Sequence, residues 1–237
     1  MIKKRIPVSL KIKAHLFKNF LSNVYKGYSF RFAKKASHSE FDFNHSIEIT
    51  QEIKNTESSK AKKLNFKTAI DSIEEYIIKP NEVFSFWGAV GNPTSKRGYV
   101  KSRSIVDGVL EESIGGGLCQ ISGLIYYSCI LANIDVLERY NHTADIYTEE
   151  TRFTPLGSDA TVVYGYKDLK IRNSLKHPIV FGFSLTETEI TIQLKSLEAI
   201  DKQRITFKKT TLKNKKIEVL TFINEQEYDR SVYNILH

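Results

Sequence analysis

The chain has 237 residues, of which 41% are hydrophobic and 26% are charged, as in an ordinary folded protein with room for a sizeable core. Its 35 basic and 27 acidic residues give a net charge of +8, which favours acidic partners or simply maintains solubility. The sequence has no zinc-finger spacing, aromatic RNA-binding signature or arginine-dense recognition helix, so we expect no nucleic-acid partner.

A basic amphipathic helix is predicted over residues 9–26. Its apolar stripe consists of residues at helical spacing, namely Leu10, Ala14, Phe17, Leu21 and Val24. We expect this stripe to dock on the domain, and weak contact with a membrane surface is the alternative. No stretch approaches the roughly 20 apolar residues of a membrane span, and no signal peptide is recognisable. We therefore expect a cytoplasmic protein, peripheral at the inner membrane surface if this helix binds lipid.

Residues 27–60 are expected to form a polar connector with one short strand or helix. A second helix follows and is ended by Pro80. A strand over residues 104–110 contains Asp107-Gly108 as a hairpin turn. The second helix is predicted over residues 58–78. A buried strand over residues 83–87 and a third helix over residues 118–133 are the other elements predicted in this part of the chain.

Strand patterns dominate after the third helix. The candidate strands are residues 135–140, 142–148, 159–166, 169–173, 179–185, 189–194, 204–210 and 217–222. Helices first and strands later predict an α+β fold, with a mainly antiparallel sheet packed against a central helix. We divide the chain into an N-terminal segment (1–57), a central domain (58–195) and a C-terminal β-hairpin extension (196–237) that turns at Lys213-Asn214-Lys215.

Three consecutive glycines, Gly115, Gly116 and Gly117, lead directly into the third helix. Glycine runs are costly in a folded chain, so this run indicates positive φ angles or a close backbone approach. Cys119 follows at the helix start, near unpaired N–H groups and the positive end of the helix dipole. Both favour a thiolate, and the same N–H groups could hold an anion or a developing oxyanion. We therefore expect this turn, together with Gln120, to form a binding site.

Cys119 and Cys129 are the two cysteines, ten residues apart in one predicted helix. About 80° of rotation and roughly 15 Å separate them, which rules out a disulfide, and two free thiols suit a reducing compartment. Cys119 shares a polar helix face with Ser122, Gly123 and Tyr126, whereas Cys129 is expected in the core. Cys119 is either a nucleophile or an inert buried thiol, and both interpretations remain open.

A nucleophilic cysteine needs a general base, and His142 is the best placed of the six histidines. It lies at the start of a predicted strand after the helix, an order that permits a Cys–His pair for acyl transfer. Asp159, at the start of the strand predicted from residue 159, is our choice to orient the imidazole. Asp145 is a poorer choice because it is expected on the opposite strand face.

Metal binding by Cys119, His142 and an acidic residue is the rival chemistry, but the sequence has no C-x-x-C or H-E-x-x-H spacing. A P-loop is excluded because no Gly-Lys-Ser/Thr follows the glycines. We therefore expect neither a metal ion nor another cofactor.

Several motifs occur in an order that resembles the VanW family, over roughly residues 60 to 195. They are Phe84-Ser85-Phe86-Trp87, Val90-Gly91, Pro93-Thr94, Gly98-Tyr99, Gly115-Gly116-Gly117-Leu118-Cys119-Gln120, Glu138-Arg139-Tyr140-Asn141-His142 and Pro155-Leu156-Gly157-Ser158-Asp159-Ala160-Thr161. The resemblance implies a cell-wall or glycopeptide-resistance context. It implies no defined reaction, so the site residues rest on the residues themselves.

Two functions are consistent with the sequence. The first is an amidase- or transpeptidase-like enzyme that uses Cys119, His142 and Asp159 on a peptidoglycan stem peptide or precursor, with Arg97, Arg103, Arg139 or Arg152 pairing with a substrate carboxylate. The second is a non-catalytic module that binds the same peptides. In it the glycine turn would grip the carboxylate, and Trp87 with Tyr126 would form an apolar wall.

Overall fold

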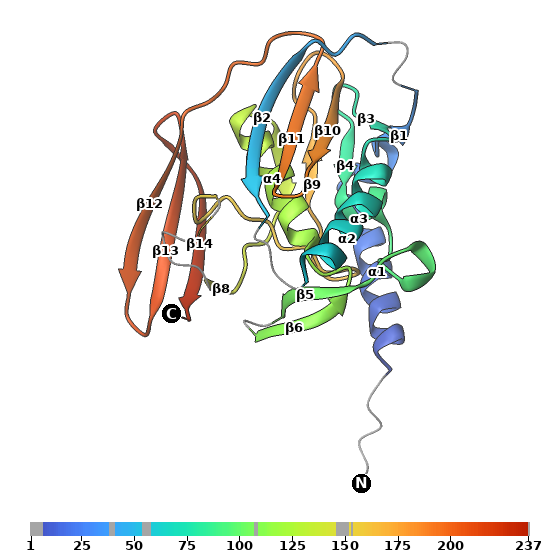
Figure 1. Cartoon of the computed structure of the whole chain (residues 1–237). Coiled ribbons are helices and arrows are strands. Elements are labelled where there is room, and N and C mark those ends of the chain that lie inside the picture. Colours follow the sequence, from blue (N-terminus) through green and yellow to red (C-terminus); the bar gives the residue numbers. More distant parts are fainter. Residues whose placement is uncertain are drawn as a thin grey trace.

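The computed structural model describes residues 7–37, 41–53, 58–106, 109–145, 152 and 154–236. Within these residues the fold is α+β, as predicted, with several mostly antiparallel sheets around a buried helix (Figure 1). The helices are α1 (Val8–Tyr25), α2 (Ser59–Ile73), α3 (Phe86–Val90) and α4 (Leu118–Leu131), with 3-10 turns η1 (Tyr28–Phe30) and η3 (Ser95–Arg97).

The strands fall into five small sheets. Their bounds are β1 (Lys34–Lys35), β2 (His45–Glu52), β3 (Tyr76–Ile77), β4 (Val83–Ser85), β5 (Lys101–Val106), β6 (Val109–Ile114), β7 (Asp135–Glu138), β8 (Ala144–Asp145), β9 (Lys170–Arg172), β10 (Ile179–Leu185), β11 (Glu189–Ser196), β12 (Ile205–Leu212), β13 (Lys216–Ile223) and β14 (Gln226–Ile235).

The core lies between α4 and the antiparallel sheet of order β10-β11-β2 (Figure 1). Along β11, Ile190, Ile192 and Leu194 alternate with more exposed residues and are fully buried. This period of two points one face of the strand at α4. Ile121 and Ile125 of α4 are also fully buried. The helix is therefore held rigidly in the centre of the molecule.

A second sheet, of order β12-β13-β14-β8, lies to one side of the core (Figure 1). Its last strand, β14, pairs in parallel with β8, which directly follows residues 138–143. Val219 and Tyr233 of this sheet are buried together with Leu156 in a small separate cluster. The C-terminal strands are thus brought against the segment that carries the predicted base.

Some predicted elements are confirmed. The hairpin turning at residues 213–215 is present, because β12 pairs with β13 and Asn214 and Lys215 have φ angles of 62° and 52°. β5 and β6 also form a hairpin, although its predicted turn, Asp107-Gly108, lies outside the described residues. The predicted strand over residues 142–148 is seen as β8, and residues 146–148 also lie outside the described part.

Other predicted elements are wrong in type or extent. The second helix ends at Ile73, and Tyr76–Ile77 forms β3 instead of continuing it. The strand predicted over residues 83–87 stops at Ser85, because the Ser85 hydroxyl accepts a hydrogen bond from the Gly88 N–H and caps α3. β14 was not predicted, and β2 is longer than the one short strand or helix expected within residues 27–60.

The preferred prediction for the N-terminal helix is also wrong. α1 forms, but none of its residues is buried, and its apolar stripe points away from the domain. No helix within the described ranges is both long and apolar enough to cross a bilayer.

Candidate active site

The glycine turn before α4 is fixed by its surroundings. Gly115 and Gly117 have φ angles of 79° and 96°, a region that glycine enters without strain. Gly116 cannot carry a side chain, because a Cβ atom there would lie 2.2 Å from the carbonyl oxygen of Ser102. The buried Asn65 amide donates to the Gly116 carbonyl oxygen at 3.0 Å. The turn therefore sets the start of α4 in one position.

Cys119 is the second residue of α4, and its side chain is half-buried. Its thiol donates a hydrogen bond to the Val162 carbonyl oxygen, with an Sγ–O distance of 3.7 Å. No described residue accepts a hydrogen bond from the Cys119 backbone N–H. This donor lies at the positive end of the helix dipole and is able to stabilise a negative charge that develops beside the sulfur.

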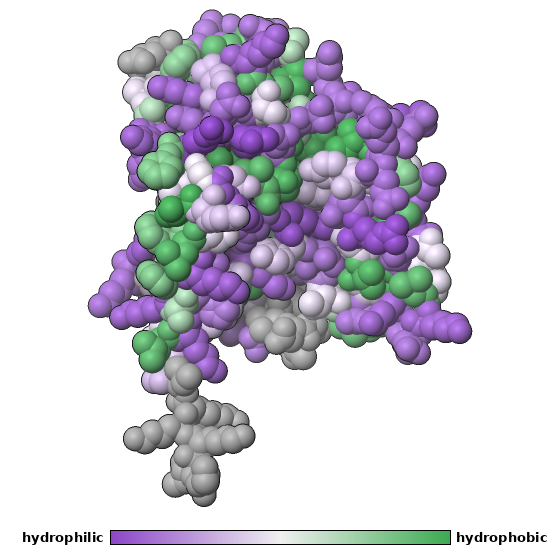
Figure 2. Space-filling view, turned by 180° about the vertical axis from the view of Figure 1, so that it is seen from behind, coloured by the Kyte–Doolittle hydropathy of each residue, from purple (hydrophilic) through white to green (hydrophobic). Residues whose placement is uncertain are grey.

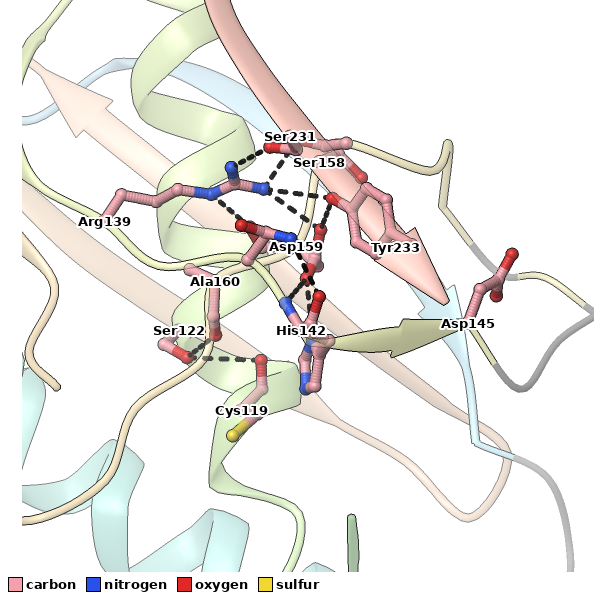
Figure 3. A network of polar contacts seen from close by, with 12 residues as sticks. Cys119, Ser122, Arg139, His142, Asp145, Ser158, Asp159, Ala160, Ser231 and Tyr233 are labelled. Atoms are coloured by element: carbon pink, nitrogen blue, oxygen red, sulfur yellow. Dashed lines mark hydrogen bonds and ion pairs between the residues drawn. The ribbon is translucent and has the colours of Figure 1, made fainter. Parts of the chain in front are cut away.

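The structure brings His142 and Asp159 into direct contact. The imidazole Nδ1 lies 2.6 Å from Asp159 Oδ2, and the His142 backbone N–H donates to the same oxygen at 2.7 Å. Both side chains are 22% exposed. Figure 3 shows the ring between the Asp159 carboxylate and Cys119. Because Asp159 engages Nδ1, the other ring nitrogen is left for chemistry on the Cys119 side.

This arrangement changes the proton affinity of all three groups. Burial would lower the pKa of His142, but the Asp159 carboxylate and Cys119 outweigh burial and raise it to about 10. Burial would likewise raise the pKa of the Cys119 thiol, but the hydrogen bond and charge of His142 lower it below its ordinary value. The pKa of Asp159 falls despite burial, because His142 and Arg139 stabilise the carboxylate. The site therefore favours transfer of the thiol proton, which points at the Val162 carbonyl oxygen in this structure, to His142 to give a thiolate–imidazolium pair.

Arg139 holds Asp159 from the side opposite His142 (Figure 3). Its guanidinium donates to the Asp159 backbone oxygen at 2.8 Å and to Oδ1 at 3.0 Å. It also donates to the Asp229 carboxylate at 2.9 Å and to the Ser231 hydroxyl. Tyr233 donates its own hydroxyl proton to Asp159 Oδ1 at 2.6 Å. Every orientation of the carboxylate except the observed one would break several of these bonds.

The segment that carries Asp159 is irregular, so the strand predicted from residue 159 is wrong. Its backbone groups bond to side chains and to a neighbouring loop. Ser122 donates to the Ala160 carbonyl oxygen at 2.6 Å, and Cys119 donates to that of Val162. The Thr161 N–H donates to the Tyr140 backbone carbonyl oxygen at 2.6 Å. These bonds tie the segment to the first turns of α4.

Four residues predicted to contact a ligand have other surroundings. Tyr126 is buried, with the Arg139 guanidinium 4.9 Å from its ring centroid, so neither side chain is available as a binding surface. Trp87 lies on α3 and donates its indole N–H to the Lys167 carbonyl oxygen at 2.7 Å. Arg152 forms two hydrogen bonds with the Asp145 carboxylate, at 2.9 and 2.7 Å.

Gln120 remains at the helix start beside the glycine turn. It is half-buried, and among the described residues its Nε2 has no hydrogen-bond acceptor. Within the same residues, no three His, Cys, Asp or Glu side chains are grouped as metal ligands. The polar groups of the site are thus a thiol, an imidazole, a carboxylate and donors at the start of α4.

The sequence analysis missed the supporting residues of β14. Asp229, Ser231 and Tyr233 alternate along this strand and all face Arg139. Their spacing of two is a strand signal that was available in the sequence. Asn65, whose amide donates to the glycine turn, gave no such signal, because a polar residue in the middle of a helix is usually exposed.

Comparisons with known proteins agree with this order of residues. A family model described as "VanW like protein" matches residues 61–195. The uncharacterized protein YoaR of Bacillus subtilis (strain 168) is 32% identical over 144 residues, which cover 61% of this chain and 46% of YoaR. The vancomycin B-type resistance protein VanW of Enterococcus faecalis (strain ATCC 700802 / V583) is 32% identical over 112 residues, which cover 47% of this chain and 41% of that protein.

The matched region therefore spans less than half the length of either relative. No solved structure matches the chain. The family match includes the glycine turn, Cys119, His142 and Asp159, and it ends before the strands β12, β13 and β14. With more than half of its residues matched by the family model, the chain belongs to the VanW-like family.

Proposed function

We propose that this protein is a cysteine-dependent enzyme that transfers or hydrolyses an acyl group of a peptidoglycan stem peptide or precursor. The observation that carries the proposal is the 2.6 Å contact between His142 and Asp159 near the start of α4, where the backbone N–H of Cys119 has no acceptor among the described residues. Nucleophile, base and orienting carboxylate then occur in the roles that covalent acyl transfer requires.

In the first step the Cys119 thiolate attacks the carbonyl carbon of an amide, and the carbonyl oxygen becomes negatively charged. The Cys119 N–H at the helix start stabilises this oxyanion. The side-chain amide of the next residue, Gln120, has no acceptor among the described residues and is a candidate second donor. The His142 imidazolium gives its proton to the leaving nitrogen as the C–N bond breaks. A thioester on Cys119 and a free amine result.

In the second step the neutral imidazole of His142 removes a proton from water or from an acceptor amine. The activated oxygen or nitrogen attacks the thioester carbon, and the Cys119 thiolate leaves. Asp159 holds Nδ1 throughout, which keeps the other ring nitrogen directed at the reacting atoms. Water as the acceptor gives hydrolysis, and an amine gives transpeptidation.

Two cations beside the glycine turn favour a substrate with a carboxylate. The Lys62 side chain packs against Gly117, with Cγ 2.7 Å from the position of an added Cβ, and burial and the nearby Arg103 lower the pKa of Lys62 to about 8. The Arg103 backbone lies against Gly116. Lys62 is paired with no acidic side chain in the described part of the chain, and Arg103 lies opposite Glu112 in the hairpin of β5 and β6. Stem peptides of peptidoglycan carry carboxylates that would neutralise this charge.

The cell-wall context rests on the relative from Enterococcus faecalis, whose name refers to vancomycin resistance. The same two cations also favour the alternative, a module that binds a peptide carboxylate at the glycine turn without chemistry. The two functions make different use of the Cys119 sulfur, and one substitution separates them.

The test is to incubate the purified chain with a peptidoglycan stem peptide and to identify products and any thioester adduct by mass spectrometry. We expect Cys119→Ser and His142→Asn to abolish turnover, while both variants still bind the peptide in calorimetry. Cys129→Ser is the matched control, because Cys129 is a buried thiol on the same helix.

Turnover that survives Cys119→Ser would contradict the enzyme proposal. Peptide binding that is weakened by Lys62→Gln and Arg103→Gln, with no product formed by the unmodified chain, would support the binding module. Absence of both binding and turnover would reject both functions.

A further inference from the structure

The outward face of α1 is the largest feature that the active site leaves unexplained. Leu10, Phe17, Leu21 and Val24 lie along one stripe of this helix and are between 38% and 63% exposed. Figure 2 shows apolar side chains in a row down one edge of the molecule, where α1 runs towards the N-terminus. A stripe of this kind normally faces a partner or the core.

The opposite face of α1 is held on the domain by polar contacts. Asn19 donates to the Gly165 carbonyl oxygen at 3.2 Å, and Lys170 donates to Asn23 at 3.0 Å. The His15 and Tyr166 rings lie 4.3 Å apart. Ile12 packs against Gly165 on the same side, so the helix is attached by a mixed face of polar and apolar contacts. The wider apolar stripe is displayed outward, unlike the stripe of an ordinary surface helix.

The margins of the apolar stripe are cationic. Lys11, Lys13 and Lys18 are exposed and project roughly 60–100° from the centre of the stripe, at 100° per residue. The helix contains no acidic residue. A second copy of this chain would bring these like charges together in a symmetric contact, with no acidic side chain on the helix to neutralise them. Anionic lipid headgroups complement such a margin while the acyl region receives the stripe.

We propose that α1 docks on an anionic lipid bilayer, lying in the plane of the surface with Leu10, Phe17 and Leu21 inserted and the lysines among the headgroups. This inference does not depend on the proposed enzyme activity. It has a consequence for the active site, because α1 rests on Gly165, three residues after the Val162 carbonyl that binds the Cys119 thiol. Docking would therefore place the site close to the bilayer surface.

The test is co-sedimentation of the full chain with vesicles of phosphatidylcholine alone and of phosphatidylcholine with 30% phosphatidylglycerol. We expect binding to the anionic vesicles that weakens as salt rises. The double variant F17S/L21S is expected to bind at least tenfold more weakly. Replacing Lys11, Lys13 and Lys18 by Gln is expected to cost about fivefold per lysine and to flatten the salt dependence.

The matched control is Leu64→Ser, which removes an exposed leucine of α2 that belongs to no such stripe. It is expected to bind vesicles like the unmodified chain. Circular dichroism of each variant would establish that the fold is retained.

Absence of binding to anionic vesicles, or equal binding by F17S/L21S, would overturn the proposal. A dimer in analytical ultracentrifugation that F17S/L21S dissociates would also overturn it and would assign the stripe to a second copy of the chain.

Discussion

Cys119 and Cys129 lie on one helix, yet their surroundings change the acidity of the two thiols in opposite directions. Burial raises the pKa of Cys129, which is 0% exposed. Burial acts on Cys119 in the same direction, but His142 lowers the pKa of that thiol below its ordinary value. The thiolate fraction rises about tenfold for each unit by which a thiol pKa falls. The two cysteines therefore form an internal comparison of reactivity.

We predict that iodoacetamide modifies Cys119 at neutral pH faster than a free thiol and leaves Cys129 unmodified. His142→Asn should remove this advantage, because the imidazolium that stabilises the thiolate is lost. The rate is measured from pH 5 to 9 by mass spectrometry of the labelled peptide. A Cys119 rate equal to that of a free thiol would contradict the thiolate–imidazolium pair.

A second prediction about a single residue concerns Asp168. Burial raises its pKa from 3.8 to about 6, although the Ser85 hydroxyl and the Trp87 N–H donate hydrogen bonds to it. Because the pKa is higher in the folded state, that state holds an extra proton between these pH values. The contribution of Asp168 protonation to the free energy of unfolding is therefore present below about pH 4 and is lost as the pH rises through about 6.

We accordingly expect the stability difference between the unmodified chain and Asp168→Asn to change by about 1–3 kcal/mol between pH 7.5 and pH 4.5, with acid favouring the unmodified chain. Urea unfolding at several pH values measures it. Asp71→Asn, at an exposed position on α2, is the control and should show no such change. A constant difference for Asp168→Asn would rule out titration of Asp168 in this range.

At the scale of elements, the glycine turn and the helix that follows it differ in how much space a glycine Cβ atom would have. A Cβ at Gly116 would collide with the Ser102 carbonyl oxygen at 2.2 Å. A Cβ at Gly123, inside α4, would meet its nearest neighbours at 3.6 Å, which is ordinary contact. The first position has no room for a methyl group and the second has.

We predict that Gly116→Ala lowers the free energy of unfolding by about 2–3 kcal/mol and slows alkylation of Cys119, because the turn must shift. Gly123→Ala is the matched control and should leave stability unchanged or raise it by about 0.5–1 kcal/mol through helix propensity. Thermal unfolding measures both. An equal effect of the two substitutions would mean that the close approach at Gly116 does not constrain the turn.

The elements also show where the sequence was sufficient. α4 could be predicted because it is a long run rich in apolar residues, and the hairpin of β10 and β11 because β11 alternates with a period of two and β10 is a short apolar run. The irregular segment around Asp159 could not, since its residues have strand propensity. Its carbonyl groups are instead bonded by Ser122 and Cys119, and such side-chain partners are invisible in a single sequence.

The site shows the same division. Cys119, His142 and Asp159 could be chosen from residue type and chain order. Arg139 was predicted to pair with a substrate carboxylate, because nothing in the sequence shows that Asp159, Asp229 and Ser231 surround its guanidinium. The outward face of α1 was missed for a related reason: an amphipathic pattern gives the stripe but not its direction.

At the scale of the whole molecule, the site combines residues of the central domain with a residue of the C-terminal strand β14. The family match ends at residue 195, yet Tyr233 of β14 donates to the Asp159 carboxylate. We predict that Tyr233→Phe costs about 1–2 kcal/mol of stability and slows alkylation of Cys119 severalfold, because Asp159 is held less firmly. Tyr228→Phe, on the same strand and without a bond to Asp159, should leave alkylation unchanged. Equal rates for both variants would show that β14 does not support the site.

The separation along the chain between Cys119 and β14 has a consequence for biosynthesis. Cys119 is translated more than a hundred residues before Tyr233, so a polypeptide that lacks β14 carries the thiol but not the strand that holds Asp159 in place. The lowered pKa of the Cys119 thiol would arise in full only when β14 pairs with β13 and β8. Reactivity of this cysteine would then report that β14 has been made and has folded onto the domain.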